Sequence, residues 1–132
     1  DMLTDLTTGN ARIRLHIQES GTQATVQANP YLLKIALKNI IDNACKYSKK
    51  EVDITLSRIN QQVVIEIEDR GIGIPQEEIE HIFQSFYRGS NTHDYAGQGI
   101  GLSLTMKIIS AYNGKLEISS EIEKGTKVRV IF

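Results

Sequence analysis

Two asparagines and a lysine recur at helical spacing in the first half of the chain. Asn39, Asn43 and Lys46 are four and three residues apart, so on a helix they share one face. Amide oxygens can ligate Mg²⁺, and an ammonium group can hold a phosphate. Each interior asparagine costs a helix up to about 0.7 kcal/mol relative to alanine, so the pair needs a reason. That reason is either a ligand or a set of buried loop carbonyls, and the spacing does not decide between them.

A carboxylate followed by two glycines ends an alternating segment further along. Asp69, Gly71 and Gly73 stand in the stretch "DRGIGIP". Glycine allows positive φ and lets a flat ligand approach the backbone closely. A carboxylate only accepts hydrogen bonds, so it suits an amino group such as the exocyclic amine of adenine. Turns rich in Asp and Gly also arise for local reasons, so this motif alone is weak evidence.

A second glycine cluster, Gly97, Gly99 and Gly101, precedes a predicted helix that begins near Leu102. Exposed N–H groups at a helix N-terminus favour phosphate. The cluster lacks a P-loop lysine and does not follow a strand, so neither common phosphate-loop fingerprint fits. A glycine hinge for a mobile loop is the alternative, and it is compatible with phosphate binding.

Between the clusters lies the polar stretch "SFYRGSNTHDYAGQG", which its composition predicts to be mobile. Arg88 opens it and could reach a phosphate with its fixed fork of donors, although an arginine at a loop edge is more often solvated. We expect Phe83 and Phe86 to pin the base of this loop by packing.

The overall composition fits one soluble domain. The chain has 132 residues, with 15 Lys and Arg against 16 Asp and Glu, and no basic tract long enough to indicate nucleic-acid binding. A lone cysteine, Cys45, excludes an internal disulfide and fits a reducing compartment. No apolar run reaches the roughly 20 residues that cross a bilayer. Because the chain opens without an initiator methionine, we expect a fragment of a longer protein.

Periodicity predicts the elements that must position these residues. Alternation indicates strands over 11–20 and, more briefly, 22–28. Asn29 as N-cap and Pro30 at the first position predict a helix to about Ser48. Further predictions are a tight hairpin of 51–59 with 61–68, a short helix over 75–86, a helix that stops at Asn113 and Gly114, and a closing hairpin of 115–121 with 126–132. This order predicts an α+β, two-layer sandwich in which a mixed sheet of about five strands is covered on one face by about three helices.

Two stripes run along the first predicted helix. The first is apolar and should face the sheet; it consists of Leu33, Leu37, Ile40, Ala44 and Tyr47. The second begins apolar and becomes polar, so it could form the wall of a binding site; it consists of Leu32, Ala36, Asn39, Asn43 and Lys46.

Four segments, in this order, resemble the boxes of the ATP-binding catalytic domain of sensor histidine kinases, in the GHKL ATPase and kinase superfamily. They are "NIIDNACKYS", "DRGIGIP", "FQSFYR" and "GQGIGLSL", and the closing "KGTKVRVIF" is similar to that family's last glycine turn and strand. The resemblance covers nearly the whole chain and implies the Bergerat fold. One departure is Asn29 where the family usually has Asp before the proline; both residues cap helices well.

The resemblance implies ATP and Mg²⁺ as cofactors and assigns roles by position. The implied catalytic residues are Asn39, Asn43, Lys46 and Arg88, and the implied metal ligands are Asn43 and Gln98. Asp69 would accept from the adenine amine. The implied nucleotide-binding set is Asn39, Asn43, Lys46, Tyr47, Asp69, Gly71, Gly73, Ile74, Tyr87, Arg88, Gly97, Gln98, Gly99, Ile100, Gly101, Leu102 and Thr126.

The reaction implied is donation of the γ-phosphoryl group of ATP to a histidine on a separate dimerisation domain of the same protein, in a two-component phosphorelay. Hydrolytic members of the superfamily resemble this chain but carry Glu at the position of Asn39, where it activates water; an amide cannot take that proton. His16, His81 and His93 lack the context of a phosphoacceptor, so the chain alone should not phosphorylate itself. Alternatives are a GHKL serine kinase and a nucleotide sensor without transfer activity.

The same resemblance implies the partners and the location. A response regulator would act downstream, and the dimerisation domain would make the homodimer. Neither nucleic acid nor direct membrane contact is expected. The domain would be cytoplasmic and part of a membrane-anchored bacterial sensor kinase.

Overall fold

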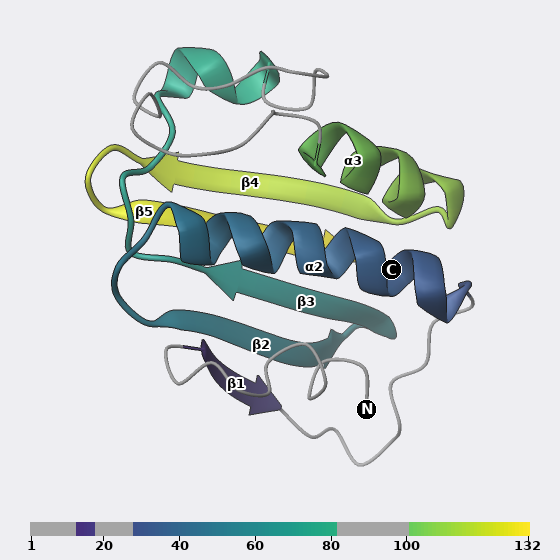
Figure 1. Cartoon of the computed structure of the whole chain (residues 1–132). Coiled ribbons are helices and arrows are strands. Elements are labelled where there is room, and N and C mark those ends of the chain that lie inside the picture. Colours follow the sequence, from purple (N-terminus) through teal and green to yellow (C-terminus); the bar gives the residue numbers. More distant parts are fainter. Residues whose placement is uncertain (1–12, 18–27, 82–100) are drawn as a thin grey trace.

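Five strands form one mixed sheet in the computed structural model, which describes residues 13–17, 28–81 and 101–132 (Figure 1). The strands are β1 (Ile13–Ile17), β2 (Val52–Ile59), β3 (Gln62–Glu68), β4 (Lys115–Glu121) and β5 (Gly125–Ile131). Their spatial order is β1-β2-β3-β5-β4. β1 pairs with β2 in parallel, and the other neighbours are antiparallel. The short strand predicted over 22–28 lies outside the described residues, except for Ala28.

Two helices lie against one face of this sheet, as Figure 1 shows: α2 (Pro30–Lys46) and α3 (Gly101–Ala111). They pack side by side, and the hydroxyl of the buried Thr105 on α3 donates to the carbonyl of Ala36 on α2, at 3.4 Å. A short 3₁₀ helix, η1 (Gln76–His81), lies next to β4. The predicted α+β, two-layer fold is therefore confirmed. No helix in the described ranges is long and apolar enough to cross a bilayer.

The start of α2 agrees with the prediction, and its end differs by two residues. Asn29 Oδ1 accepts from the N–H groups of Tyr31 and Leu32 at 2.9 and 3.3 Å. The helix ends at Lys46 rather than near Ser48. The carbonyl of the C-cap residue, Tyr47, accepts a hydrogen bond from the N–H of Ile72 at 3.2 Å, so a tertiary contact lies at the end of the helix.

The predicted apolar stripe of α2 forms one side of the core. Of its members, Tyr47 is only partly buried, and four are buried: Leu33, Leu37, Ile40 and Ala44. The opposite side comes from alternate residues of the strands, including Val52, Ile54, Ile65, Ile67, Val128 and Val130. Ala36 of the second stripe is also fully buried because α3 packs there.

The turns follow the sequence signals. Asn60 and Gln61 join β2 to β3 with φ of 51° and 67°, the doubly positive geometry of a tight hairpin. α3 ends as predicted, with Asn113 at φ 61° and the N–H of Gly114 bonded to the carbonyl of Ile109. The predicted start near Leu102 is one residue late, because α3 begins at Gly101.

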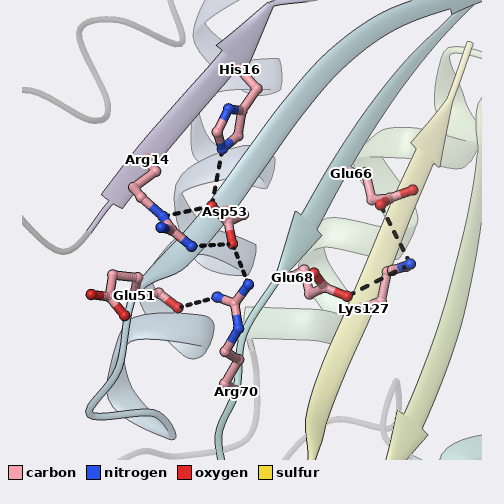
Figure 2. A network of polar contacts seen from close by, with 8 residues as sticks. All are labelled: Arg14, His16, Glu51, Asp53, Glu66, Glu68, Arg70 and Lys127. Atoms are coloured by element: carbon pink, nitrogen blue, oxygen red, sulfur yellow. Dashed lines mark hydrogen bonds and ion pairs between the residues drawn. The ribbon is translucent and has the colours of Figure 1, made fainter.

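The face of the sheet away from the helices carries charged side chains that pair across strands (Figure 2). Asp53 on β2 binds Arg14 through both carboxylate oxygens, at 2.8 and 3.0 Å, and Arg70 at 2.8 Å. His16 contacts the same carboxylate at 3.0 Å. The hydrogen bond from Arg14, followed by those from His16 and Arg70, holds the pKa of Asp53 well below its usual range, against the opposing effect of burial. We call Asp53 with Arg14, His16 and Arg70 the outer-face cluster.

Candidate functional site

The polar stripe of α2 lies at the edge of the core. Asn39 and Asn43 are both partly exposed, whereas Lys46, in the last turn, is exposed. Lys46 Nζ lies 5.9 Å from the centroid of the Tyr47 ring, a cation–π contact. No described residue hydrogen-bonds to the side-chain amide of Asn43. The stripe therefore places two amides and an ammonium group where a ligand could reach them.

Asp69 follows the last residue of β3, and its side chain is buried. Oδ1 accepts from the N–H groups of Gly71 and Thr126, at 2.9 and 3.2 Å. The Asp69 N–H in turn donates to the carbonyl of Thr126 at 2.9 Å, which extends the pairing of β3 with β5. Within the described ranges, no group donates to Oδ2 and no lysine or arginine forms an ion pair with this carboxylate.

Burial dominates the electrostatics of Asp69. Loss of water around the carboxylate raises its pKa above the usual value, and the hydrogen bonds from Gly71 and Thr126 oppose that rise only partly. The second carboxylate oxygen, which has no described donor, can accept a hydrogen bond from a ligand.

The segment after Asp69 passes between the end of α2 and the turn from β4 to β5. A Cβ on Gly71 would collide with the carbonyl of Tyr47, and a Cβ on Gly73 would collide with the carbonyl of Glu121. Gly73 also has φ +73°. Both glycines are therefore needed for close approach of two backbones, whatever ligand they also admit.

The far end of this segment is fixed by β4. The N–H of Ile74 donates to Ser120 Oγ at 2.7 Å, and Gln76 Nε2 donates to the Ser120 carbonyl at 2.6 Å. Neither Ser120 nor Gln76 was among the predicted site residues. One signal was present: Ser120 is a polar residue at an inward position of β4, in alternation with the apolar Leu116 and Ile118.

The structure joins most described members of the predicted site through a continuous series of contacts. The C-terminal end of α2 touches the glycine segment, that segment folds around Asp69, and Asp69 binds Thr126. Gly101 and Leu102 begin α3, which lies beside α2 (Figure 1). The remaining predicted members lie outside the described residues: Tyr87, Arg88, Gly97, Gln98, Gly99 and Ile100.

A metal at this site would need ligands beyond the protein's carboxylates and imidazoles. In the described part of the chain, no three His, Cys, Asp or Glu side chains are grouped so that they could hold an ion. The amide oxygens of the α2 stripe are hard donors of the kind that Mg²⁺ accepts when phosphates supply the other ligands. The donor set therefore fits a phosphate-bound Mg²⁺.

Comparison with known proteins agrees with this geometry. Residues 28–132 match the model of the family described as histidine kinase-, DNA gyrase B-, and HSP90-like ATPases. Over 98% of its length the chain is 38% identical to the signal transduction histidine-protein kinase ArlS of Staphylococcus aureus, of which it spans 27%. The chain thus corresponds to about a quarter of such relatives.

Solved structures show the same fold. The mycobacterial sensor histidine kinase MprB superposes with a TM-score of 0.84 at 24% identity, over 99% of this chain and 90% of that one. The histidine kinase domain of the E. coli osmosensor EnvZ gives a TM-score of 0.74 at 26% identity, over 99% and 83% of the two chains. The chain therefore belongs to the histidine kinase-, DNA gyrase B- and HSP90-like ATPase family, and it corresponds to the ATP-binding catalytic module of its sensor histidine kinase relatives.

Proposed function

We propose that this module binds Mg-ATP and donates the γ-phosphoryl group to a histidine on a separate dimerisation domain of the same protein. The observation that carries the proposal is Asp69: a buried carboxylate with one oxygen held by two backbone N–H groups and no described donor on the other. The exocyclic amine of adenine is a donor of the required kind.

The α2 stripe would hold the other end of the nucleotide. Asn43 would supply an amide oxygen for Mg²⁺, with Asn39 one turn before it and Lys46 one turn after it. When bound, Mg²⁺ neutralises charge on the phosphates. We assign Gln98 as a second metal ligand and Arg88 as a γ-phosphate contact on the resemblance alone.

Transfer, rather than hydrolysis, is favoured by the residue at position 39. A hydrolase needs a base that takes a proton from water, and the amide of Asn39 cannot take one at neutral pH. Phosphoryl transfer needs mainly positioning and charge neutralisation, which amides, an ammonium group and a metal can provide.

We infer that the phosphoacceptor is supplied by another part of the protein. His16 is not placed to accept the phosphoryl group, because its ring contacts Asp53 on the face of the sheet away from α2. We place the acceptor histidine on a separate dimerisation domain of the longer protein, and a response regulator downstream of it. We expect the module to act in the cytoplasm, where ATP is present.

The test is transfer in trans. The chain is mixed with the helical dimerisation domain of its full-length protein and ATP labelled at the γ-phosphate, and acid-labile label on that domain is measured. We expect label on the domain, none on the chain alone, and none with the Asp69→Asn chain. Nucleotide binding without any label on the domain would overturn the transfer step and favour a nucleotide sensor.

A further inference from the structure

A buried serine outside the proposed nucleotide contacts lies at the junction of the site's backbone segments. Ser120, near the end of β4, is 9% exposed. Its hydroxyl has three polar neighbours: the N–H of Ile74 at 2.7 Å, the carbonyl of Gly125 at 3.1 Å and the hydroxyl of Thr126 at 2.8 Å. Gln76 fixes the same residue by donating to its carbonyl at 2.6 Å.

The chemistry of these neighbours limits where the protons can lie. A hydroxyl donates one proton and accepts through two lone pairs. The N–H of Ile74 can only donate, so it takes one lone pair of Ser120 Oγ. The carbonyl of Gly125 can only accept, so it takes the Ser120 proton. The arrangement that satisfies all three contacts then requires Thr126 to donate its proton to Ser120.

This arrangement fixes what Thr126 offers to a ligand. With its proton directed to Ser120, Thr126 Oγ1 can only accept from any other group. Thr126 also lies beside Asp69, because its N–H donates to Oδ1 of that carboxylate at 3.2 Å. The neighbourhood of Asp69 thus presents the carboxylate oxygen and the threonine oxygen, both as acceptors.

We propose that Ser120 is a positioning residue that holds the hydroxyl of Thr126 as an acceptor beside Asp69, and so makes the site select a purine with an amino group over one with an oxo group. The inference rests on the proposed nucleotide binding and adds a residue that acts through Thr126 rather than by touching the base. Without Ser120, the Thr126 hydroxyl is free to turn and donate, and an oxo group becomes acceptable.

The test compares ATP with inosine triphosphate, which carries an oxo group in place of the adenine amine. Affinities of both are measured for the wild type, Ser120→Ala, Thr126→Val and the double variant, together with thermal unfolding of each. Ser119→Ala is the matched control, because Ser119 is the exposed neighbour of Ser120 on the same strand. The ratio of the affinity for ATP to that for inosine triphosphate is used, because a general loss of folding weakens the binding of both nucleotides alike.

We expect Ser120→Ala to lower the preference for ATP by about fivefold, which corresponds to one modest hydrogen bond. On the Thr126→Val background the same change should leave the ratio unaltered, since the hydroxyl through which Ser120 acts is gone. Ser119→Ala should match the wild type. If Ser120→Ala does not fold, Ser120→Cys is measured in both backgrounds, because a thiol is only a weak donor and acceptor; a smaller fall is expected.

Two results would overturn the inference. An unchanged ratio in a folded Ser120 variant, or an equal fall with and without the Thr126 hydroxyl, would show that Ser120 does not act through Thr126; the proposed ATP binding would then stand. No binding of either nucleotide by the folded wild type would instead overturn the proposed function, and the inference with it.

Discussion

Asp53 and Asp69 lie close together in the sheet and have opposite environments. Asp53 pairs in register with Glu68, the residue just before Asp69, so side-chain alternation directs the two aspartates to opposite faces. Asp53, on the outer face, is bound by two arginines and a histidine (Figure 2). Asp69, on the side of the helices, is buried, accepts two backbone N–H groups and has no described cation as a partner.

The two pKa shifts follow from this contrast. Cations around Asp53 lower its pKa, and burial raises the pKa of Asp69. The first carboxylate is satisfied within the protein, so its role is structural. The second has one oxygen without a described donor and a raised pKa, a combination that is common at functional sites. Substitutions at the two positions should therefore separate binding from folding.

The largest effect expected is on binding at Asp69. Asp69→Asn should weaken the binding of an ATP analogue by about 100-fold or more, because the amide places an NH₂ group against the adenine amine. Stability should stay level or rise, since Oδ1 of asparagine still accepts from Gly71 and Thr126 and no charge is buried. Thermal unfolding with and without the analogue measures both quantities. A full ligand-induced shift in this variant would contradict the assignment.

The backbone contacts around Asp69 can be broken without substituting Asp69 itself. Gly71→Ala would drive a Cβ into the carbonyl of Tyr47, which cannot move without shifting the end of α2. We expect a loss of about 2 kcal/mol or more in unfolding free energy, measured in urea. A variant as stable as the wild type would show that the two backbones are not held at this separation.

Asn43→Ala tests the metal end of the site. We expect about tenfold weaker binding of the ATP analogue in the presence of Mg²⁺ and little change in its absence, since one metal ligand is lost. Asp42→Ala is the matched control, because Asp42 is exposed on the same turn and pairs only with Lys38, at 3.3 Å, among described residues. Equal losses in the two variants would argue against a role for Asn43.

Asp53→Asn should have the opposite effect to Asp69→Asn. Removing the charge takes away the ion-pair partner of Arg14 and Arg70, although Arg70 keeps its hydrogen bond to the Glu51 carbonyl. We expect the melting temperature to fall by about 5 °C, with less effect at high salt. Affinity for the ATP analogue should be unchanged. A loss of affinity with a normal melting temperature would mean that the outer-face cluster serves the site.

The smallest effects expected are in pH dependence, and they differ in sign. The stability from Asp53, whose pKa is lowered on folding, is present above its unfolded pKa and is lost as the pH falls through the folded value. Asp69 has a raised pKa, so its charge opposes folding, and that cost disappears as the pH falls through the raised value. ATP affinity should fall as the pH falls through the same value, because a protonated Asp69 accepts less well from the adenine amine. The free energy of unfolding is measured against pH. The loss of stability at low pH that Asp53 causes should be absent in Asp53→Asn, and the gain at low pH that Asp69 causes should be absent in Asp69→Asn.

Local signals predicted most of the fold. Asn29 and Pro30 predicted the start of α2, Asn60 and Gln61 the hairpin, and Asn113 with Gly114 the end of α3, because each acts on the backbone of its own segment. The end of α2 was missed by two residues because the contact of Tyr47 with Ile72 is tertiary.

The predicted site residues include neighbours in the structure, but the residues that support them were not predicted. Spacing and resemblance selected Asp69 and Thr126, which the structure brings together. The reason for Gly71 could not be read from the sequence, since the carbonyl it accommodates belongs to Tyr47, on another element. The outer-face cluster could not be predicted either, because it depends on the pairing of two distant strands. Arg14 and Asp53 are 39 residues apart and meet only when β1 pairs with β2.

Calorimetry of an ATP analogue with Mg²⁺, on the wild type, Asp69→Asn and Asp53→Asn in parallel, tests most directly whether Asp69 is the nucleotide-binding carboxylate. We predict that the wild type and Asp53→Asn bind equally and that Asp69→Asn shows no measurable heat. Binding by Asp69→Asn at wild-type strength, or no binding by the folded wild type, would contradict the assignment of Asp69 as the nucleotide-binding carboxylate.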